Sequence, residues 1–216
     1  MPLLLNLLVL LSGYLLGSIP AGWLAGRWLA GIDLRQEGSG STGATNVLRV
    51  VGKGPALAVF LIDVLKGTAA VLLAKALLQP HGFDAVSDGW VVAAGLAALA
   101  GHIWPVWLGW KGGKAVATGL GMLLGLAWPV GLACFGIFLT VLTVSRIVSL
   151  SSVVAALSLP LLMIGWFGGG RFGGDGWRPA YLILALITTV LVVWRHRSNL
   201  KRLLEGSEPR LGAKTG

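Results

Sequence analysis

The feature that most constrains this chain is a series of long apolar stretches without a charged residue. Residues 3–26, 90–108 and 147–170 each approach the roughly 20 residues that a helix needs to cross a bilayer. Of the 216 residues, 56% are hydrophobic and only 12% are charged, which is too little polar surface for a water-soluble domain. The sequence therefore predicts an all-α polytopic membrane protein and excludes a pair of water-soluble domains.

We expect about seven helical crossings, some of them short, separated by glycine-rich or charged segments. The charge-free run 115–145 is divided at Trp128 and Pro129, because proline interrupts a helix. A single tilted helix there would reverse the sidedness of everything downstream. The first stretch is expected to be retained, since it is longer than the apolar core of a secretory signal. The expected spans are 3–26, 55–76, 90–108, 115–127, 129–145, 147–168 and 179–194.

The distribution of charge predicts which loops face the cytoplasm. The segment after the first span carries Arg27, Arg35, Arg49 and Lys53. The next loop, residues 79–88, has acidic residues and no Lys or Arg. The positive-inside rule then puts the amino terminus outside and the carboxy terminus in the cytoplasm. The loop with Arg171, Asp175 and Arg178 is the one basic segment that falls outside. We expect one membrane domain over residues 1–200 and a basic cytoplasmic tail over residues 201–216.

The most informative polar segment is the glycine-rich run at residues 38–46, which is followed by Arg49. Small residues let backbone N–H groups approach an anion, and arginine can add a bidentate contact to phosphate. The run has the spacing of a dinucleotide-binding loop, but it follows a membrane helix rather than a strand. Ala44 stands where a Walker A loop has its lysine. A phosphate group is the predicted ligand, and the alternative is a flexible loop of small residues.

A second segment, residues 101–118, places Lys111 and Lys114 on either side of two glycines beside a membrane helix. Lysine suits phosphate, although the same pattern is typical of a positively charged membrane anchor. We expect His102 to be a hydrogen-bonded structural group rather than a base. Asp63 and Lys66 lie within the second span and are expected either to pair with each other or to face the protein interior, as structural support.

Two further polar segments flank the last two predicted spans. Residues 145–152 combine one cation, Arg146, with four serines, which can also serve helix packing. His196 and Asn199 are three residues apart and would share a helix face near the membrane surface. For the cations that follow, a role as ordinary juxtamembrane anchors is preferred over chemistry. These anchors are Lys201, Arg202 and Arg210.

Taken together, these segments resemble the PlsY family of bacterial glycerol-3-phosphate acyltransferases over nearly the whole chain. The family's first motif usually has Asn where this chain has Ser41, and its second usually has Phe and Gly at Trp110 and Ala115. An aromatic residue is common at Ile147. The resemblance implies seven helices, acyl phosphate as donor, lysophosphatidic acid as product, and a soluble enzyme that supplies acyl phosphate. The His-x4-Asp pair of soluble-type glycerolipid acyltransferases is missing from the chain.

We expect the two phosphate substrates to bring about four negative charges into one poorly solvated pocket, where cations offset them. No carboxylate lies within the motifs except Glu37 at their edge. The base is therefore expected to be a substrate phosphate, with a second pKa of about 6, or else His196. The predicted catalytic residues are Ser39, Arg49, Lys114, His196 and Asn199. The predicted substrate-binding residues are Gly38, Gly40, Gly43, Thr45, Asn46, Lys111, Gly112, Gly113, Arg146 and Ser149.

Within this scheme the glycine-rich run cradles one phosphate, Lys114 and Ser149 stabilise the departing one, and His196 and Asn199 orient the glycerol. No metal, cofactor or nucleic acid is expected, and the predicted location is the bacterial inner membrane with the active site facing the cytoplasm. A transporter of phosphate or an organic phosphate is the main alternative, although it should have related halves, and none are visible. A noncatalytic lipid-binding scaffold is a third possibility.

Overall fold

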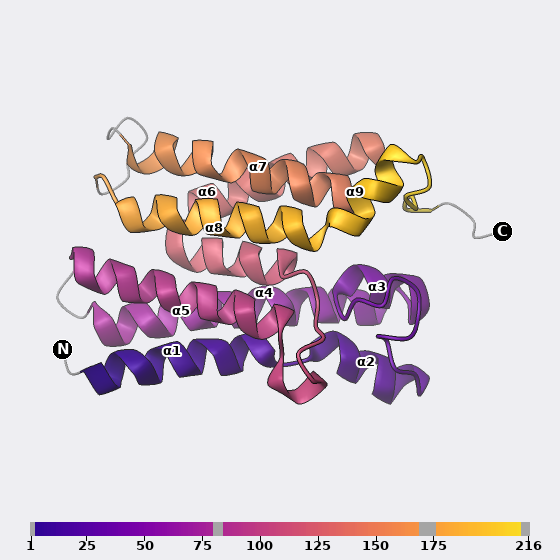
Figure 1. The fold of residues 1–216 in the computed structure, drawn as a ribbon, viewed down its shortest axis with the longest axis horizontal. Helices are drawn as coiled ribbons and strands as arrows, with labels where there is room; N and C mark the ends of the chain where they lie inside the picture. The colour runs from indigo at the N-terminus through magenta and orange to yellow at the C-terminus, as the bar shows by residue number, and fades with distance from the viewer. Residues whose placement is uncertain (1–2, 80–83, 169–175, 213–216) are drawn as a thin grey trace. The chain divides into compact units, whose positions relative to one another are not determined.

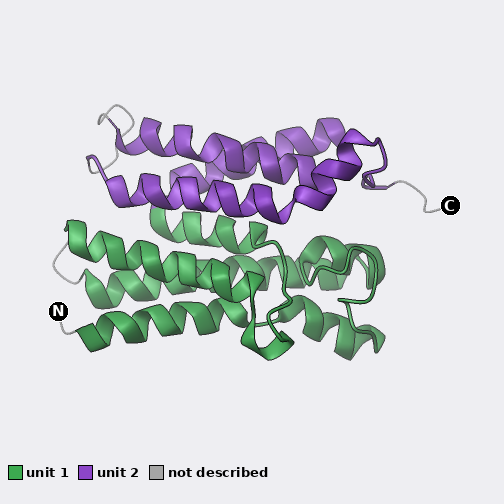
Figure 2. Cartoon of the chain, viewed as in Figure 1, with its two compact units in different colours: residues 1–126 green, residues 127–216 purple. Residues whose placement is uncertain are grey.

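The computed structural model of the protein describes residues 3–79, 84–168 and 176–212, and every regular element within them is a helix (Figure 1). The all-α architecture predicted from the sequence is thus confirmed. Contacts group the chain into two compact units, residues 1–126 (unit 1) and residues 127–216 (unit 2) (Figure 2). The division into one domain and a tail stays a prediction. Arg171 and Asp175, in the predicted outer loop, lie outside the described residues.

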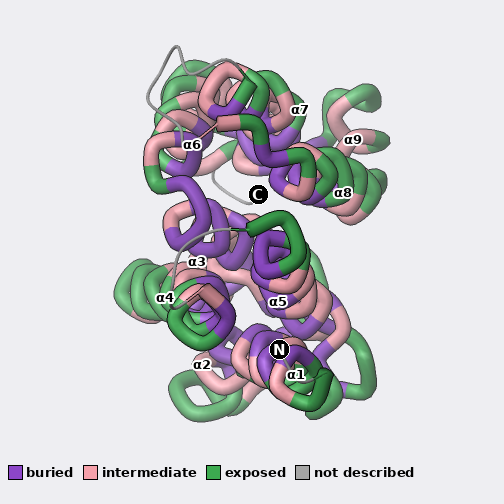
Figure 3. The backbone as a smooth tube through the Cα atoms, turned by 90° about the vertical axis from the view of Figure 1, so that its left-hand side faces the viewer, coloured by how far each residue is buried: buried purple, intermediate pink, exposed green. Residues whose placement is uncertain are grey.

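Unit 1 is built on long helices that pack along their lengths. Its elements are α1 (Leu3–Ser18), α2 (Ala21–Ala30), α3 (Ala44–Val50), α4 (Lys53–Leu78), α5 (Ala85–Ile103), the 3-10 turn η1 (Val106–Leu108) and the first part of α6 (Val116–Ser145). Helix α5 packs against α1 and α4, and it is the most buried of the long helices in this unit (Figure 3). The short helix α3 packs on α4. The polar loops between these helices therefore rest on a helical scaffold.

Small residues let the helices of unit 1 approach closely. A Cβ on Gly17 of α1 would overlap the carbonyl oxygen of Ala98 in α5, and one on Gly67 of α4 would overlap that of Thr118 in α6. Close backbone contact through glycine is a common way to pack helices in a membrane, where the hydrophobic effect supplies little attraction. These two glycines therefore hold α1 and α4 against their neighbours.

Unit 2 contains the second part of α6 together with α7 (Val148–Phe167), α8 (Pro179–Arg195) and α9 (Arg197–Leu204). Helices α7 and α8 pack against each other, and the Thr189 hydroxyl of α8 donates to the Ala156 carbonyl of α7 at 2.7 Å. The rings of Phe167 and Tyr181 meet edge to face, with centroids 5.1 Å apart. Helix α9 is bent by 57° from α8. This bend lies at His196, one of the predicted site residues.

Five helical segments in the described residues are long and apolar enough to cross a membrane, or six if α8 and α9 form one broken span. Helix α6 runs through the segment that the sequence divides, but Ala127, two residues before Pro129, has non-helical angles (φ −148°, ψ 82°). The predicted interruption is therefore present, displaced by one residue from Trp128. The count of seven crossings and the sidedness of the two termini stay predictions.

Lys75 stabilises the end of the first part of α6. Its Nζ donates to the carbonyl oxygens of Gly125 at 2.8 Å and Leu126 at 2.9 Å. Those oxygens would ordinarily accept from residues four positions on, but Pro129 has no N–H and Ala127 departs from the helix. A lysine in an apolar helix thus satisfies backbone groups that the break exposes.

We expect Lys75→Met to lower the free energy of unfolding by about 1–3 kcal/mol, because two buried carbonyl groups lose a charged donor. Thermal unfolding of the purified protein in lipid nanodiscs measures this. Lys53→Met is the matched control, since Lys53 is exposed at the other end of the same helix. Equal losses in the two variants would contradict the role assigned to Lys75.

Candidate active site

The glycine-rich loop of unit 1 is organised by one buried side chain, Asn46. Its Nδ2 lies 3.2 Å from the carbonyl oxygen of Leu34 and 2.9 Å from those of Glu37 and Ser41. Its Oδ1 accepts from the backbone N–H of Ser39 at 2.9 Å. Asn46 is 1% exposed, so these contacts are shielded from water. The structure shows Asn46 holding the loop, and its direct contact with phosphate stays a prediction.

Two glycines give this loop its shape. Gly38 and Gly40 have φ values of +57° and +67°, in the left-handed region that other residues adopt only with strain. A Cβ on Gly38 would also overlap Asn46 Oδ1. The glycines are needed for the turn, and residues 36–40 around it are exposed.

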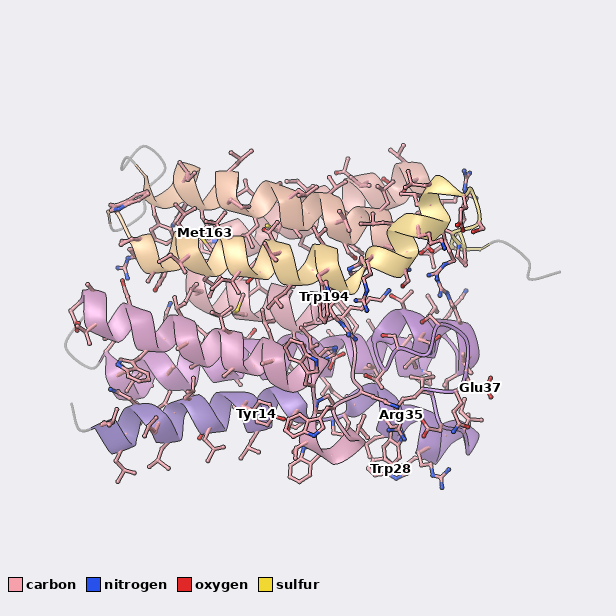
Figure 4. The ribbon with its side chains drawn as sticks, viewed as in Figure 1. Tyr14, Trp28, Arg35, Glu37, Met163 and Trp194 are labelled. Atoms are coloured by element: carbon pink, nitrogen blue, oxygen red, sulfur yellow. The ribbon has the colours of Figure 1, made fainter. Side chains whose placement is uncertain are left out.

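Arg35 connects the segment before this loop to the turn before the lysines. Its guanidinium pairs with Asp33, with Nη2 2.6 Å from Oδ2, and its Nη1 donates to the Leu108 carbonyl at 3.0 Å. Figure 4 shows Arg35 and Glu37 at the end of unit 1 formed by α2 and α3. The hydrogen bond from Arg35 holds the pKa of Asp33 well below its ordinary value. The glycine-rich loop and the lysine-bearing turn are thus tied to the same end of unit 1.

The turn that carries Lys111 and Lys114 is folded against the end of α5. The backbone N–H of Gly112 donates to the Ile103 carbonyl and that of Gly113 to the His102 carbonyl, both at 3.1 Å. A Cβ on Gly113 would overlap the His102 ring, so glycine is required at this contact. Lys111 is exposed, whereas Lys114 is half-buried.

Ala115, which follows this turn, has a φ of +59°. That is a left-handed conformation in which glycine is unstrained and alanine is not. The resemblance drawn from the sequence expects glycine at this position, and the backbone supplies the physical reason. The methyl group is accommodated in a buried position, with Ala115 3% exposed.

The polar site of unit 2 centres on Glu208. Its Oε1 accepts from Ser149 Oγ and from Asn199 Nδ2, each at 2.7 Å, and its Oε2 accepts from Arg202 Nε at 2.8 Å. Glu208 is 7% exposed. The segment after α9 is fixed as well, because the Leu211 N–H donates to the carbonyl of Arg146 at 2.7 Å. One carboxylate therefore joins two of the predicted site residues.

Burial pushes the pKa of Glu208 upward, but hydrogen bonds from Asn199, Ser149 and Arg202 outweigh it, and the pKa lies below its ordinary value. Glu208 is accordingly ionised at neutral pH and is a poor proton acceptor. His196 differs, because its Nδ1 lies 2.8 Å from the Val192 carbonyl. A carbonyl only accepts, so Nδ1 carries the proton and Nε2 is the acceptor in the neutral ring. The contact with Val192 thus fixes the ring orientation of His196, and its part in proton transfer stays a prediction.

The structure corrects the sequence interpretation of this segment at Arg202. The sequence predicts an ordinary membrane anchor there, but the Arg202 side chain donates to the buried Glu208. No carboxylate except Glu37 lies within the motifs, and Glu208, which lies outside them in the sequence, is within hydrogen-bonding distance of Ser149 and Asn199. No local pattern marks Glu208 as buried, because it follows the exposed residues of 204–207. The sequence likewise marks Arg35 only as a cation.

The expected residues fall into two sets. Unit 1 holds the glycine-rich loop, Arg49 and the lysine turn, and the predicted pairing of Asp63 with Lys66 is confirmed there at 2.7 Å. Unit 2 holds Arg146, Ser149, His196 and Asn199. The single pocket expected to unite all of them stays a prediction. Each set combines cations with backbone or side-chain donors, which is the chemistry that phosphate esters require.

Fold and site together define a polytopic helical membrane protein with loops suited to phosphate esters. The family model described as glycerol-3-phosphate acyltransferase matches residues 7–206. The chain belongs to this family, and it is an integral membrane acyltransferase.

Relatives and solved structures cover almost the whole chain. The glycerol-3-phosphate acyltransferase of Prochlorococcus marinus (strain MIT 9313) is 75% identical over 207 residues, covering 96% of this chain and 95% of that protein. That of Parasynechococcus marenigrum (strain WH8102) is 64% identical over 214 residues, covering 99% and 93%. The crystal structure of PlsY, an integral membrane glycerol 3-phosphate acyltransferase, in its glycerol 3-phosphate form is 38% identical with a TM-score of 0.84 and 96% coverage of each chain. Its lysophosphatidic acid form is 37% identical with a TM-score of 0.82, covering 96% of this chain and 95% of that chain.

We expect Asn46→Ala to loosen the glycine-rich loop, since three carbonyl groups and the Ser39 N–H lose their common partner. The cost to the free energy of unfolding should be about 1–3 kcal/mol. Hydrogen exchange of residues 34–46, followed by mass spectrometry, reports the loosening directly. Ser41→Ala is the control, because its hydroxyl accepts only a long bond of 3.4 Å from Gly43. Unchanged exchange in Asn46→Ala would contradict the organising role.

Proposed function

We propose that the protein transfers an acyl group from acyl phosphate to the 1-hydroxyl of sn-glycerol 3-phosphate, giving lysophosphatidic acid and inorganic phosphate. The observation that carries this is the pair of phosphate-suited loops in unit 1, the glycine-rich loop and the lysine turn, held at one end by Arg35. The glycerol 3-phosphate and lysophosphatidic acid forms of PlsY support the acceptor and the product. The donor rests on the family resemblance.

The proposed reaction needs positive charge more than a nucleophilic side chain. The glycerol oxygen attacks the acyl carbonyl carbon, the bond from that carbon to the phosphate oxygen breaks, and the phosphate leaves with its electron pair. Acyl phosphate is already activated, so positioning and charge stabilisation supply most of the rate. Arg49 and Lys111 bind substrate phosphate, and Lys114 stabilises the phosphate that departs. The Ser149 hydroxyl hydrogen is donated to Glu208 and so does not serve that phosphate.

The hydroxyl proton goes to a substrate phosphate or to Nε2 of His196, whose orientation suits either acceptance of the proton or a hydrogen bond to glycerol. Asn199 orients the acceptor beside it. Glu208 is not the base, because three donors stabilise its ionised form. No acyl group is carried on Ser39, so an acylated Ser39 trapped in a single turnover would contradict the direct transfer.

The experiment uses purified protein in nanodiscs with radiolabelled glycerol 3-phosphate and synthetic palmitoyl phosphate. We expect labelled lysophosphatidic acid and one equivalent of inorganic phosphate. A parallel reaction with palmitoyl-CoA should give no product above background. Product from palmitoyl-CoA alone would overturn the donor assignment, and uptake of intact glycerol 3-phosphate into vesicles without acylation would favour the transporter.

We also propose that the protein lies in the bacterial inner membrane with its active site facing the cytoplasm and its amino terminus outside. Five or seven crossings both place the termini on opposite sides, whereas six would place them together. Single cysteines at Glu37, Lys201 and Val86, in a Cys134→Ala background, distinguish these cases by labelling of intact cells. Val86 alone should react with an impermeant reagent added outside. External labelling at Glu37 would overturn the assigned sidedness.

A further inference from the structure

A cluster of four buried polar side chains lies in unit 1, and the reaction proposed above does not use it. Asp63 and Lys66 come from α4, His102 from α5 and Thr118 from α6. His102 Nδ1 is 3.5 Å from Asp63 Oδ1 and 3.2 Å from Thr118 Oγ1, and Lys66 Nζ is 2.7 Å from Asp63 Oδ1. All four residues are at most 7% exposed. Ionisable groups inside membrane helices are costly, so their presence calls for a role.

The buried cluster reaches the segments around the glycine-rich loop. Lys66 Nζ donates to the Ile19 carbonyl at 3.0 Å, in the short break between α1 and α2. A small pocket at this point is lined by Pro20 and by Thr42 of the glycine-rich loop, together with Asp63, Lys66 and His102. The cluster therefore fixes the scaffold from which that loop projects.

The same cluster supports the lysine turn through His102. The carbonyl of His102 accepts from the Gly113 N–H, and its ring packs so closely on Gly113 that a Cβ there would overlap Nε2. Lys114 follows directly in the chain, and Thr118, which contacts the other side of the ring, lies in the first turn of α6. One edge of the His102 ring is thus hydrogen-bonded to Thr118 and lies 3.5 Å from Asp63, and the other edge meets the turn.

We propose that His102 is a positioning residue, oriented by Asp63 and Thr118, that sets the backbone of the Lys111–Lys114 turn and with it the location of the Lys114 amine. This inference rests on the role proposed for Lys114 in binding the departing phosphate. Lys66 neutralises Asp63 and so allows the carboxylate to remain buried beside the ring. The cluster thereby links the folding of three helices to the geometry of the phosphate-binding turn.

The first experiment compares His102→Ala, His102→Asn and the control Lys75→Met in the full chain in nanodiscs. A displacement of the turn by about 1 Å should lower kcat/KM by about 10²-fold in His102→Ala. It should also change the rate at which Lys114 reacts with an amine-modifying reagent, read by mass spectrometry well below the unfolding temperature. Asparagine places an amide near the position of Nδ1, so His102→Asn should recover most of both properties. Lys75→Met should lower stability and leave both properties unchanged.

The second experiment measures coupling with the glycines. Gly113→Ala clashes with the His102 side chain, whereas Gly112→Ala clashes with the His102 backbone oxygen. Gly113→Ala should lower Tm less in a His102→Ala background than in the wild type. Gly112→Ala should lower Tm equally in both backgrounds. The proposal would be overturned if Lys114 reacted at the same rate in His102→Ala as in the wild type. It would also be overturned if Gly113→Ala lowered Tm equally in the wild-type and His102→Ala backgrounds. Both readouts are independent of turnover, so they remain decisive if the protein fails to use acyl phosphate.

Discussion

Replacing Glu208 with alanine should remove most of the acyltransferase activity and destabilise the fold. Ser149, Asn199 and Arg202 would lose their shared acceptor within a site where Glu208 is 7% exposed. Leaving such donors unpaired should cost about 3 kcal/mol of unfolding free energy. Because Asn199 and Ser149 would no longer be held in place, kcat/KM should fall by about 10²-fold or more. Thermal unfolding and initial rates measure the two effects.

Glu205 supplies a matched control for this prediction. It lies three residues earlier, is exposed, and among the described residues forms a surface ion pair with Lys201 at 3.9 Å. Surface pairs of this kind contribute little, so Glu205→Ala should change the free energy of unfolding by about 0.5 kcal/mol at most. Glu208→Gln keeps an oxygen acceptor and should lose less than Glu208→Ala. Similar losses from Glu205→Ala and Glu208→Ala would rule out the hydrogen-bonded centre as the cause.

The hydrogen bonds to Glu208 also predict a dependence on pH. The pKa of Glu208 is lower in the folded protein than its ordinary value, despite the opposing effect of burial. A carboxyl group of this kind stabilises the fold at pH values above the pKa that it has in the unfolded chain. The stabilisation is lost as the pH falls through the pKa that the group has in the folded protein. Stability should thus decline below about pH 4.5, the ordinary range for Glu. In Glu208→Gln this acid-dependent component should be absent.

The sequence predicts the helical membrane architecture because that property depends on local composition. Apolar stretches of bilayer length identify the long helices, and Pro129 marks the break in α6 to within two residues, at Ala127. The spacing of Asp63 and Lys66 likewise predicts their contact, since residues three apart share a helix face. The count of crossings is harder to predict, because composition does not decide whether a broken helix crosses once or twice.

The candidate site is only partly predictable, because its organising residues are recognised by tertiary contacts. The sequence predicts Asn46 as a phosphate ligand, and the structure shows its amide nitrogen bonded to carbonyls of the loop and of the segment before it. Arg35 and Glu208 act through partners 73 and 59 residues away, Leu108 and Ser149 respectively. Hydrogen bonds over such separations leave no periodic signal in the sequence. The sequence therefore predicts that the site binds phosphate, because this follows from residue chemistry. It does not predict which residues hold the phosphate-binding groups in place.

The lysine turn offers the sharpest test of the proposed chemistry, because it presents two lysines that differ in environment. Lys111 is exposed and Lys114 is half-buried. Interactions of a charge with phosphate are screened by water and salt, so the less exposed lysine should contribute more.

Lys114→Met should therefore lower kcat by about 10²- to 10³-fold, the usual cost of removing one group that stabilises charge developing in a transition state. Lys111→Met, in which the exposed cation is lost, should lower kcat by less than about tenfold and act mainly through KM. Initial rates over a range of both substrates separate the two parameters. Since the departing phosphate gains charge only as its bond to carbon breaks, a defect confined to KM in Lys114→Met would show that Lys114 binds ground-state substrate instead.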